Sequence, residues 1–316
     1  MSSVFSRLAG AVTASLCLLA APAFAAVPLK WAPPALVNPV VITIGSGFFH
    51  ARVSTSQDCI LRWPSTKHVG TVWIEGCHNL VSMGGWNTVP PAKLSNGTVD
   101  LSNNANSRIL YLSSTTGVAH IEGLLGDSSG GAMSDGIDIE APQATVEIEN
   151  VRIDGIYGYN NEFHADCVQP FGGVKALRLY NFTCNTAYQG LSIWPVATSP
   201  KGWTADIERT NITSVGAQIW GWHNSGGYVY WPCRDSLCTN AALTSMNQVY
   251  LQQRPVNPFT MTVYSPKMAV VAGAPQTITF PGLSVVGHVT QGLPPGGDFV
   301  PAGVAGVHYV SPGYVS

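Results

Sequence analysis

The feature that most constrains the fold is a repeating pattern of short apolar and polar alternations in the middle of the chain. One series is centred on Ile121, Ile148, Leu179 and Ile207, which are 27, 31 and 28 residues apart. A second series lies between them, at residues 108–112, 135–139, 166–169 and 189–193. Alternation with a period of two is typical of β-strands, because successive side chains point to opposite faces. Two interleaved series with a common spacing predict strands that stack on one another.

The variable spacing favours a parallel β-helix over a helical repeat. Loops between stacked strands can lengthen without disturbing the stack, whereas helical repeats keep a tighter period. The chain also has 33 Gly and 22 Pro among its 316 residues, which indicates many turns and few long helices. We therefore expect an all-β solenoid followed by an irregular C-terminal tail.

The first 25 residues have the pattern of a secretory signal peptide. Arg7 precedes an apolar stretch at residues 8–20, and the A-F-A sequence at residues 23–25 matches a cleavage site. The apolar run is shorter than the ~18 residues of a membrane-spanning helix. We expect a secreted or periplasmic protein without a membrane span.

The remaining residues, 26–316, are predicted to form one domain. Regular rungs are expected over about 40–240, and a C-terminal strand and tail region over about 241–316. The formal net charge is −2 and no basic block occurs. Nucleic acid is therefore an unsuitable partner, because phosphate binding needs a concentrated cationic surface.

Three asparagines, Asn150, Asn181 and Asn211, follow strands of the first series at intervals of 31 and 30 residues. Asn tolerates the left-handed backbone of tight turns, and stacked Asn side chains can hydrogen-bond along a solenoid. Asn is also common in ordinary turns, which is the alternative at each single position. The threefold recurrence favours a ladder.

With these strand segments, the motifs V-E-I-E-N and L-R-L-Y-N, and the export signal, the chain resembles the right-handed parallel β-helix proteins of the pectate-lyase-like superfamily. The resemblance covers roughly residues 40–213. It implies a substrate cleft along the outside of one parallel sheet. The chain contains neither the paired-Asp and G-H-G signatures of polygalacturonases nor an R-x-P-x-x-R motif like that of some pectate lyases, so the resemblance concerns architecture.

Six cysteines follow residue 25, and an even number in an exported chain indicates disulfides. Two pairs have similar separations of 18 and 17 residues, and a third pair flanks a short polar loop. The predicted disulfides are Cys59–Cys77, Cys167–Cys184 and Cys233–Cys238. A zinc site is the alternative, but structural zinc normally uses C-x-x-C pairs or nearby His ligands, and an oxidising compartment favours disulfides.

The densest group of polar residues lies in the second series. Side chains at equivalent positions of stacked strands become neighbours, because such strands lie ~4.8 Å apart. The candidate catalytic residues are Asp138, Glu162, His164 and Asp166. The candidate substrate-binding residues are Gln169, Tyr188, Gln189, Trp194, Trp220 and His223. Asp135, Asp138 and Asp166 could alternatively hold Ca²⁺.

Structural roles are the alternatives for these groups. If His164 and Asp166 point inward, they form a hydrogen-bonded corner that orders a turn. The aromatic residues either stack on sugar faces or fill a core, as most aromatic side chains do.

Together, the resemblance and the polar group predict an enzyme that cleaves a polysaccharide, as a lyase slightly in preference to a glycoside hydrolase. A lyase needs a base, a cation beside a uronate and in some cases Ca²⁺, and the nearest basic residues are Arg152, Lys175 and Arg178. A hydrolase needs two carboxyl groups and no cofactor. The alternative is a non-catalytic envelope or matrix β-helix that binds polysaccharide. We expect a monomer in either case.

Overall fold

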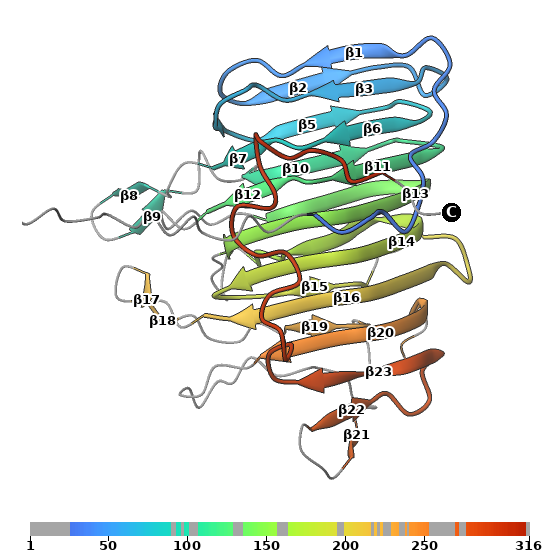
Figure 1. Cartoon of the computed structure of the whole chain (residues 1–316), viewed down its shortest axis with the longest axis vertical. Helices are drawn as coiled ribbons and strands as arrows, with labels where there is room; N and C mark the ends of the chain where they lie inside the picture. The colour runs from blue at the N-terminus through green and yellow to red at the C-terminus, as the bar shows by residue number, and fades with distance from the viewer. Residues whose placement is uncertain are drawn as a thin grey trace, which may run out of the picture.

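The computed structural model describes residues 26–89, 93–95, 98–100, 107–128, 135–156, 164–194, 199–215, 218–219, 222–223, 229–233, 238, 240–252, 269–271 and 276–313. The regular secondary structure of these residues is β-strand, without an α-helix, so the all-β prediction is confirmed. Most strands belong to a 19-stranded sheet in which neighbours pair mainly in parallel. Figure 1 shows the strands stacked from β1 to β23.

The parallel pairings form three rows. The first row contains β2 (Phe49–Arg52), β5 (Val72–Glu75), β10 (Arg108–Ser113), the beginnings of β13 (Asp135–Ile156) and β14 (Val168–Thr186), β15 (Leu191–Ser192) and β19 (Tyr230–Trp231). Leu110 pairs with Ile137, Ile137 with Val168, and Val168 with Leu191. All four side chains are fully buried. The second predicted series is therefore confirmed as a column of stacked strands.

The second row contains β1 (Val40–Thr43), β3 (Cys59–Arg62), β6 (Leu80–Met83), β11 (Val118–Glu122), the middle of β13 and β14, and then β16 (Thr204–Ser214), β20 (Leu243–Gln252) and β23 (Val285–Gln291). Ile121, Ile148, Leu179 and Ile207 pair in this order, which confirms the first predicted series. Parallel pairing continues through β20 to β23. The regular stacking thus extends beyond the expected limit near residue 240.

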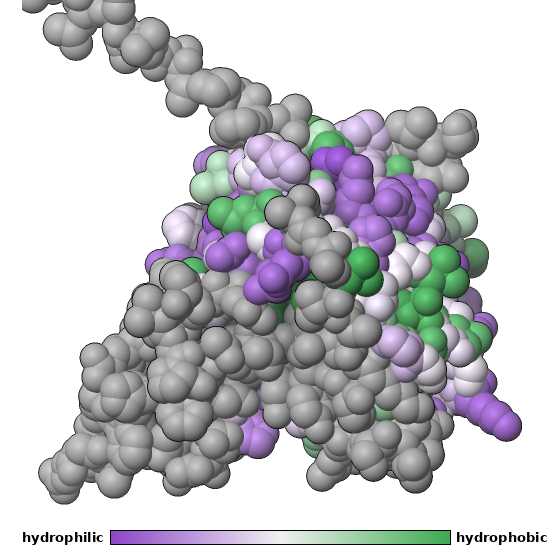
Figure 2. All heavy atoms as spheres, turned by 90° about the horizontal axis from the view of Figure 1, so that it is seen from below, coloured by the Kyte–Doolittle hydropathy of each residue, from purple (hydrophilic) through white to green (hydrophobic). Residues whose placement is uncertain are grey.

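The third row contains β4 (His68–Val69), β7 (Trp86–Thr88), β12 (Leu125–Asp127) and the last parts of the long strands. Antiparallel pairs are formed by β8 (Lys93–Ser95) with β9 (Thr98–Asp100) and by β17 (Gln218–Ile219) with β18 (Trp222–His223). The strands β21 (Ala269–Val271) and β22 (Thr277–Thr279) add antiparallel to β23. Seen from this end, the described surface has polar residues interspersed with apolar ones (Figure 2).

Buried apolar side chains from the three rows form one continuous cluster. Disulfides join Cys59 to Cys77, Cys167 to Cys184, and Cys233 to Cys238, which are the pairs that the sequence spacing favours. Cys167 and Cys184 are fully buried members of the cluster. Because Cys167 follows Asp166 directly, this disulfide fixes the backbone at the beginning of β14.

The predicted asparagine ladder is correct at two of its three positions. Asn150 and Asn181 have φ values of 53° and 51°, and the Asn181 Nδ2 donates a hydrogen bond of 2.7 Å to the Asn150 Oδ1. The prediction is wrong for Asn211, which pairs with Thr183. Arg209, with φ of 45°, occupies the left-handed position instead. The register explains the difference. Tyr180, just before Asn181, pairs with Glu208, just before Arg209, so Asn181 and Arg209 occupy equivalent positions.

Both ends of the described chain lie against the outside of the second row (Figure 1). The backbone N–H groups of Lys30 and Trp31 donate to the carboxylate of Glu149. The Leu29 N–H donates to the Gly313 carbonyl at 2.9 Å. Residues 292–313 contain no strand and run along the body, as expected for an irregular tail. In the part of the chain that the structure describes, no helix could cross a membrane.

Candidate functional site

The candidate site lies on the outer surface of the first row. Along each strand of this row, residues that point into the core alternate with residues that point away from it. The residues pointing away form a column in register, made up of His50, Trp73, Tyr111, Asp138 and Gln169. The strands place these residues next to one another although their sequence positions span more than a hundred residues. The column has an aromatic part and a polar part.

The aromatic part is a stack of rings. His50 and Trp73 lie with ring centroids 3.8 Å apart, and Trp73 and Tyr111 with centroids 5.0 Å apart. The guanidinium of Arg108 lies 4.8 Å from the centroid of Tyr111. Rings that stack on each other stabilise the strand stack, but the covered faces are not available to a sugar. The aromatic part therefore supports the site rather than forming a platform for a glycan.

The polar part contains three carboxyl groups around one guanidinium. The Arg108 Nε lies 2.5 Å from the Asp138 Oδ2 and 3.9 Å from the Asp135 Oδ2. The backbone N–H of Asp166 donates to the Asp135 Oδ1 at 2.9 Å. All three aspartates are buried. Arg108 and Asp135 pair as the first residues of β10 and β13, so strand register brings this cluster together.

Burial raises the pKa values of all three carboxyl groups, because a low dielectric disfavours the charged form. The pKa of Asp135 is raised to about 7, first by desolvation and then by the charge of Asp138, against the opposing effect of Arg108. Burial and the same two carboxylates raise the pKa of Asp166 well above its usual value. Burial also raises the pKa of Asp138, but the contact with Arg108 opposes this shift.

The three carboxyl groups have different surroundings. Arg108 contacts Asp138 and opposes the rise of its pKa, whereas the charged neighbours of Asp166 are carboxyl groups that raise its pKa further. Different surroundings are the means by which enzymes assign acid and base roles to chemically identical groups. Asp135, with its pKa raised to about 7, can release or take up a proton near neutral pH.

A pocket of about 260 Å³ opens beside the cluster. It is lined by Arg108, Asp135, His164, Gln169, Phe171, Gln189, Trp194 and Trp231. Asp135 is the one carboxyl group among these lining residues. The pocket combines an acid, an exposed imidazole, two amides and aromatic rings, which are the groups that position a sugar.

Aromatic side chains form the apolar part of this pocket. The ring centroids of Trp194 and Trp231 lie 5.0 Å apart at an angle of 54°. Phe171 is 42% exposed. Exposed rings of this kind offer apolar area to the flat face of a sugar.

The structure brings several predicted site residues to the pocket and leaves others behind it. Among the residues predicted from sequence, the ones in the lining are Asp135, His164, Gln169, Gln189 and Trp194. Asp138, Asp166 and Tyr188 are buried outside the lining. Tyr188 lies 6.0 Å from His164, ring to ring, so it supports the imidazole instead of facing a ligand.

Three predicted residues lie wholly or partly outside the described residues. Glu162 and Trp220 lie outside the described residues. His223 belongs to β18, but its side chain is also outside the described part.

Sequence reasoning missed Arg108 and Phe171, named Trp231 only within the general group of aromatic residues that could stack on sugars, and assigned Asp135 to a metal site only. The signal for Arg108 was present, because residues 108–112 and 135–139 belong to the same series and Arg108 stands opposite Asp135. The predicted lyase cations lie elsewhere. Arg152 binds Asp154 and Asp298, and Arg178 binds Glu147 on the second row.

The cluster does not fit the suggested Ca²⁺ site. Arg108 already supplies the positive charge between Asp135 and Asp138. A hard cation needs several oxygen ligands, and the Asp138 Oδ2 is already in contact with the Arg108 Nε. No group of three or more His, Cys, Asp or Glu side chains in the described ranges is arranged to hold a metal.

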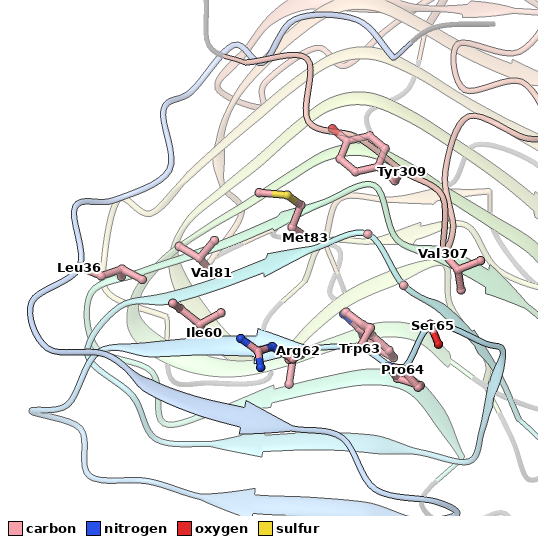
Figure 3. Close-up of a pocket in the computed structure, with 13 residues that line it drawn as sticks. Leu36, Ile60, Arg62, Trp63, Pro64, Ser65, Val81, Met83, Val307 and Tyr309 are labelled. Atoms are coloured by element: carbon pink, nitrogen blue, oxygen red, sulfur yellow. The ribbon is translucent and has the colours of Figure 1, made fainter. Parts of the chain in front are cut away.

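A larger pocket of about 460 Å³ lies on the second row, away from this cluster. Figure 3 shows Ile60, Val81 and Met83 on adjacent strands, with Val307 and Tyr309 of the tail across from them. This pocket is mainly apolar and has no carboxyl group in its lining. Size alone therefore does not identify the site, and the chemistry favours the smaller pocket.

Comparison with known proteins finds no matching family model, no matching curated sequence and no matching solved structure.

Proposed function

We propose that the protein is an exported glycoside hydrolase whose chain winds as a right-handed parallel β-helix. The fold is supported by the order of the rows: the chain passes from the first row to the second and third, and returns to the first one strand further along. Parallel strands joined by such crossovers are right-handed in about 98% of cases. The three disulfides and the signal-peptide pattern support export.

The observation that carries the proposed activity is the position of Asp135, which lines the pocket beside the ion pair of Arg108 and Asp138 and whose pKa burial raises to about 7. Asp135 donates its proton to the glycosidic oxygen as the bond to the anomeric carbon breaks. Positive charge then develops on the sugar, and the Asp138 carboxylate stabilises it across a low dielectric. A proton donor with a pKa near the working pH is the most effective general acid.

Water completes the reaction at the anomeric carbon. The imidazole of His164 lines the same pocket and is the basic group that takes the proton of this water. Water adds its oxygen to the sugar and gives one proton to His164; His164 then releases this proton to solvent, and Asp135 takes up a proton from solvent, so the enzyme returns to its starting state. The products are two shorter glycans, one with a new reducing end.

The geometry supports a lyase less well than a hydrolase. A lyase needs a deprotonated base and a cation that neutralises the uronate carboxylate. His164 could serve as the base of either reaction, but the cation in the pocket lining, Arg108, is already bound to Asp138 and does not neutralise a uronate. Hydrolysis needs no such cation.

The test is incubation of the purified protein with a panel of neutral and acidic polysaccharides. Hydrolysis gives new reducing ends without the absorbance of unsaturated uronates. Appearance of that absorbance would replace the proposal with a lyase. Binding without any product would favour the non-catalytic alternative.

A further inference from the structure

We infer that this site binds a neutral polysaccharide, whose sugars carry no charge where they lie along the outer surface of the first row. The inference rests on the proposed function and adds the substrate class. It comes from the charges of the whole row rather than from the pocket alone. Polysaccharides differ mainly in charge, since a polyuronate carries one carboxylate per sugar and a neutral glycan carries none.

Arg52, Glu75, Ser113 and Glu140 form a second column beside the first. The Arg52 guanidinium lies 2.9 Å from the Glu75 Oε2, and the His50 Nε2 lies 2.9 Å from the same oxygen. The Arg52 cation is thus paired with a carboxylate of its own row. Glu140 continues the column with another carboxyl group, directly beside the site.

The other arginine in these strand segments is Arg108, which contacts Asp138 at 2.5 Å. Both guanidinium groups described on this surface therefore face carboxylates of the protein. The carboxyl groups of the row outnumber them: Glu75, Asp135, Asp138 and Glu140, with Asp166 behind them. Glu75 and Asp138 are paired with arginines, Glu140 has no guanidinium contact among the described side chains of the row, and the surface gains negative charge as the pH rises above the pKa of Asp135, about 7.

A polyuronate chain lying along this surface would find both described guanidinium groups already paired with carboxylates of the protein, and it would meet the carboxyl group of Glu140 beside the pocket. Like charges brought together at a binding surface disfavour that partner, and they also slow its approach at low ionic strength. A binding site for such a chain needs cations whose charge the protein does not already neutralise. The described part of the row offers none.

The uncharged polar groups of the pocket suit a neutral sugar. Gln169 and Gln189 present amides, each of which can donate and accept hydrogen bonds from hydroxyl groups. Trp194, Trp231 and Phe171 supply apolar area for a sugar face. Amides and rings recognise a hydroxyl-rich ring without requiring a charge on it.

The test compares polymers that share a backbone and differ in charge. The probes are polygalacturonate with its fully methyl-esterified form, alginate with its propylene glycol ester, and carboxymethyl cellulose with hydroxyethyl cellulose, together with neutral galactan, xylan and mannan. Affinity electrophoresis at low ionic strength measures retardation of the protein by each polymer. We expect a neutral polymer to bind at least about 10-fold more tightly than any charged one.

A charged polymer that binds as tightly as its neutral counterpart would overturn the inference and leave the proposed hydrolase intact. Absence of binding and of cleavage with every polymer would overturn the proposed function itself, so the two failures are distinguishable.

A double variant tests whether the carboxyl groups of the row weaken the binding of charged polymers. Replacing Glu75 and Glu140 together (Glu75→Gln, Glu140→Gln) removes two carboxyl groups from the row. We expect retardation by polygalacturonate to increase several-fold at low salt and to lose this gain at high salt. Glu208→Gln on the second row is the control and leaves retardation unchanged. Equal retardation of the double variant and the control would count against the electrostatic argument.

Discussion

The Nε of Arg108, the first residue of β10, lies 2.5 Å from the Asp138 Oδ2 on the neighbouring strand β13. Asp135 on that same strand lies farther from the guanidinium, at 3.9 Å. A single cation placed unequally between two carboxyl groups gives them different charge states. This difference is the physical basis of the proposed acid catalysis.

Replacement of the proposed acid should remove most of the activity. Asp135→Asn keeps the size of the side chain but cannot donate an acidic proton, so we expect kcat to fall about 100-fold or more. Asp206→Asn on the second row is the matched control and should retain activity. Reducing-end assays on a cleaved glycan measure both. Equal activity of the two variants would exclude Asp135 as the acid.

The rate should also depend on pH through the same group. The pKa of Asp135 is about 7, so the protonated form that donates the proton is lost as the pH rises through this value. We expect kcat/KM to be higher at pH 6 than at pH 8 and to fall about 10-fold per pH unit well above 7. A profile that rises over this interval would contradict the assigned role.

Removal of Arg108 should destabilise the protein more in alkaline than in acidic solution. Arg108→Gln leaves Asp138 buried without its cation, which costs about 3 kcal/mol when the carboxylate stays charged. At lower pH the carboxyl group can take up a proton, so the cost becomes smaller. Urea unfolding at pH 5 and pH 8 measures the difference. Arg52→Gln, at a side chain that is 73% exposed, should change stability by less than about 1 kcal/mol.

The wild-type protein should become more stable as the pH falls from 8 to 5. Burial raises the pKa values of Asp135 and Glu149 to about 7, well above the ~4 of an unfolded carboxyl group. Between these values the folded chain holds protons that the unfolded chain releases, so the free energy of unfolding decreases as the pH rises. Glu149→Gln should reduce this dependence.

Other carboxyl groups do not reverse this trend. The pKa values of Asp58 and Glu75 are lowered, by backbone hydrogen bonding and by Arg52 respectively, so they titrate below the interval from pH 5 to 8. Chemical unfolding at several pH values checks the prediction. A stability that increases from pH 5 to pH 8 would contradict the raised pKa values of Asp135 and Glu149.

The asparagine ladder should have a measurable energetic value. Asn181→Ala removes the hydrogen bond to Asn150 and places a residue with a Cβ and no polar group at φ of 51°, so we expect a loss of about 1–3 kcal/mol. Asn181→Gly removes the same hydrogen bond without the backbone strain and should lose less. Urea unfolding compares the two variants. An equal loss for both would assign the effect to the hydrogen bond alone.

Much of the stacking could be predicted from sequence because it is encoded locally. The centres of both series, such as Ile148 and Ile137, pair with the expected residues, since apolar alternation directly determines which side chains are buried. The error at Asn211 has a similar local cause. The recurrence of Asn suggested a position, but register along β16 places Arg209 there instead.

The site was harder to predict, because it depends on how deeply each side chain is buried. Asp166 was one of the candidate catalytic residues, with an inward structural role as the alternative, and it is buried outside the pocket lining. Asp135 was considered only as a metal ligand, although it is the carboxyl group that lines the pocket. Sequence alternation gives the face of a strand but not the depth of a pocket, which depends on the loops and on neighbouring strands.

The hydrogen bond between Leu29 and Gly313 has a practical consequence for engineering. It places the two terminal segments side by side on the second row, while the proposed catalytic pocket lies on the first. A short peptide linker could join these segments, and the chain could be reopened at a surface loop between strands. Circular permutants made in this way would move affinity tags or fusion partners to another part of the surface and leave the pocket proposed to bind sugar unchanged.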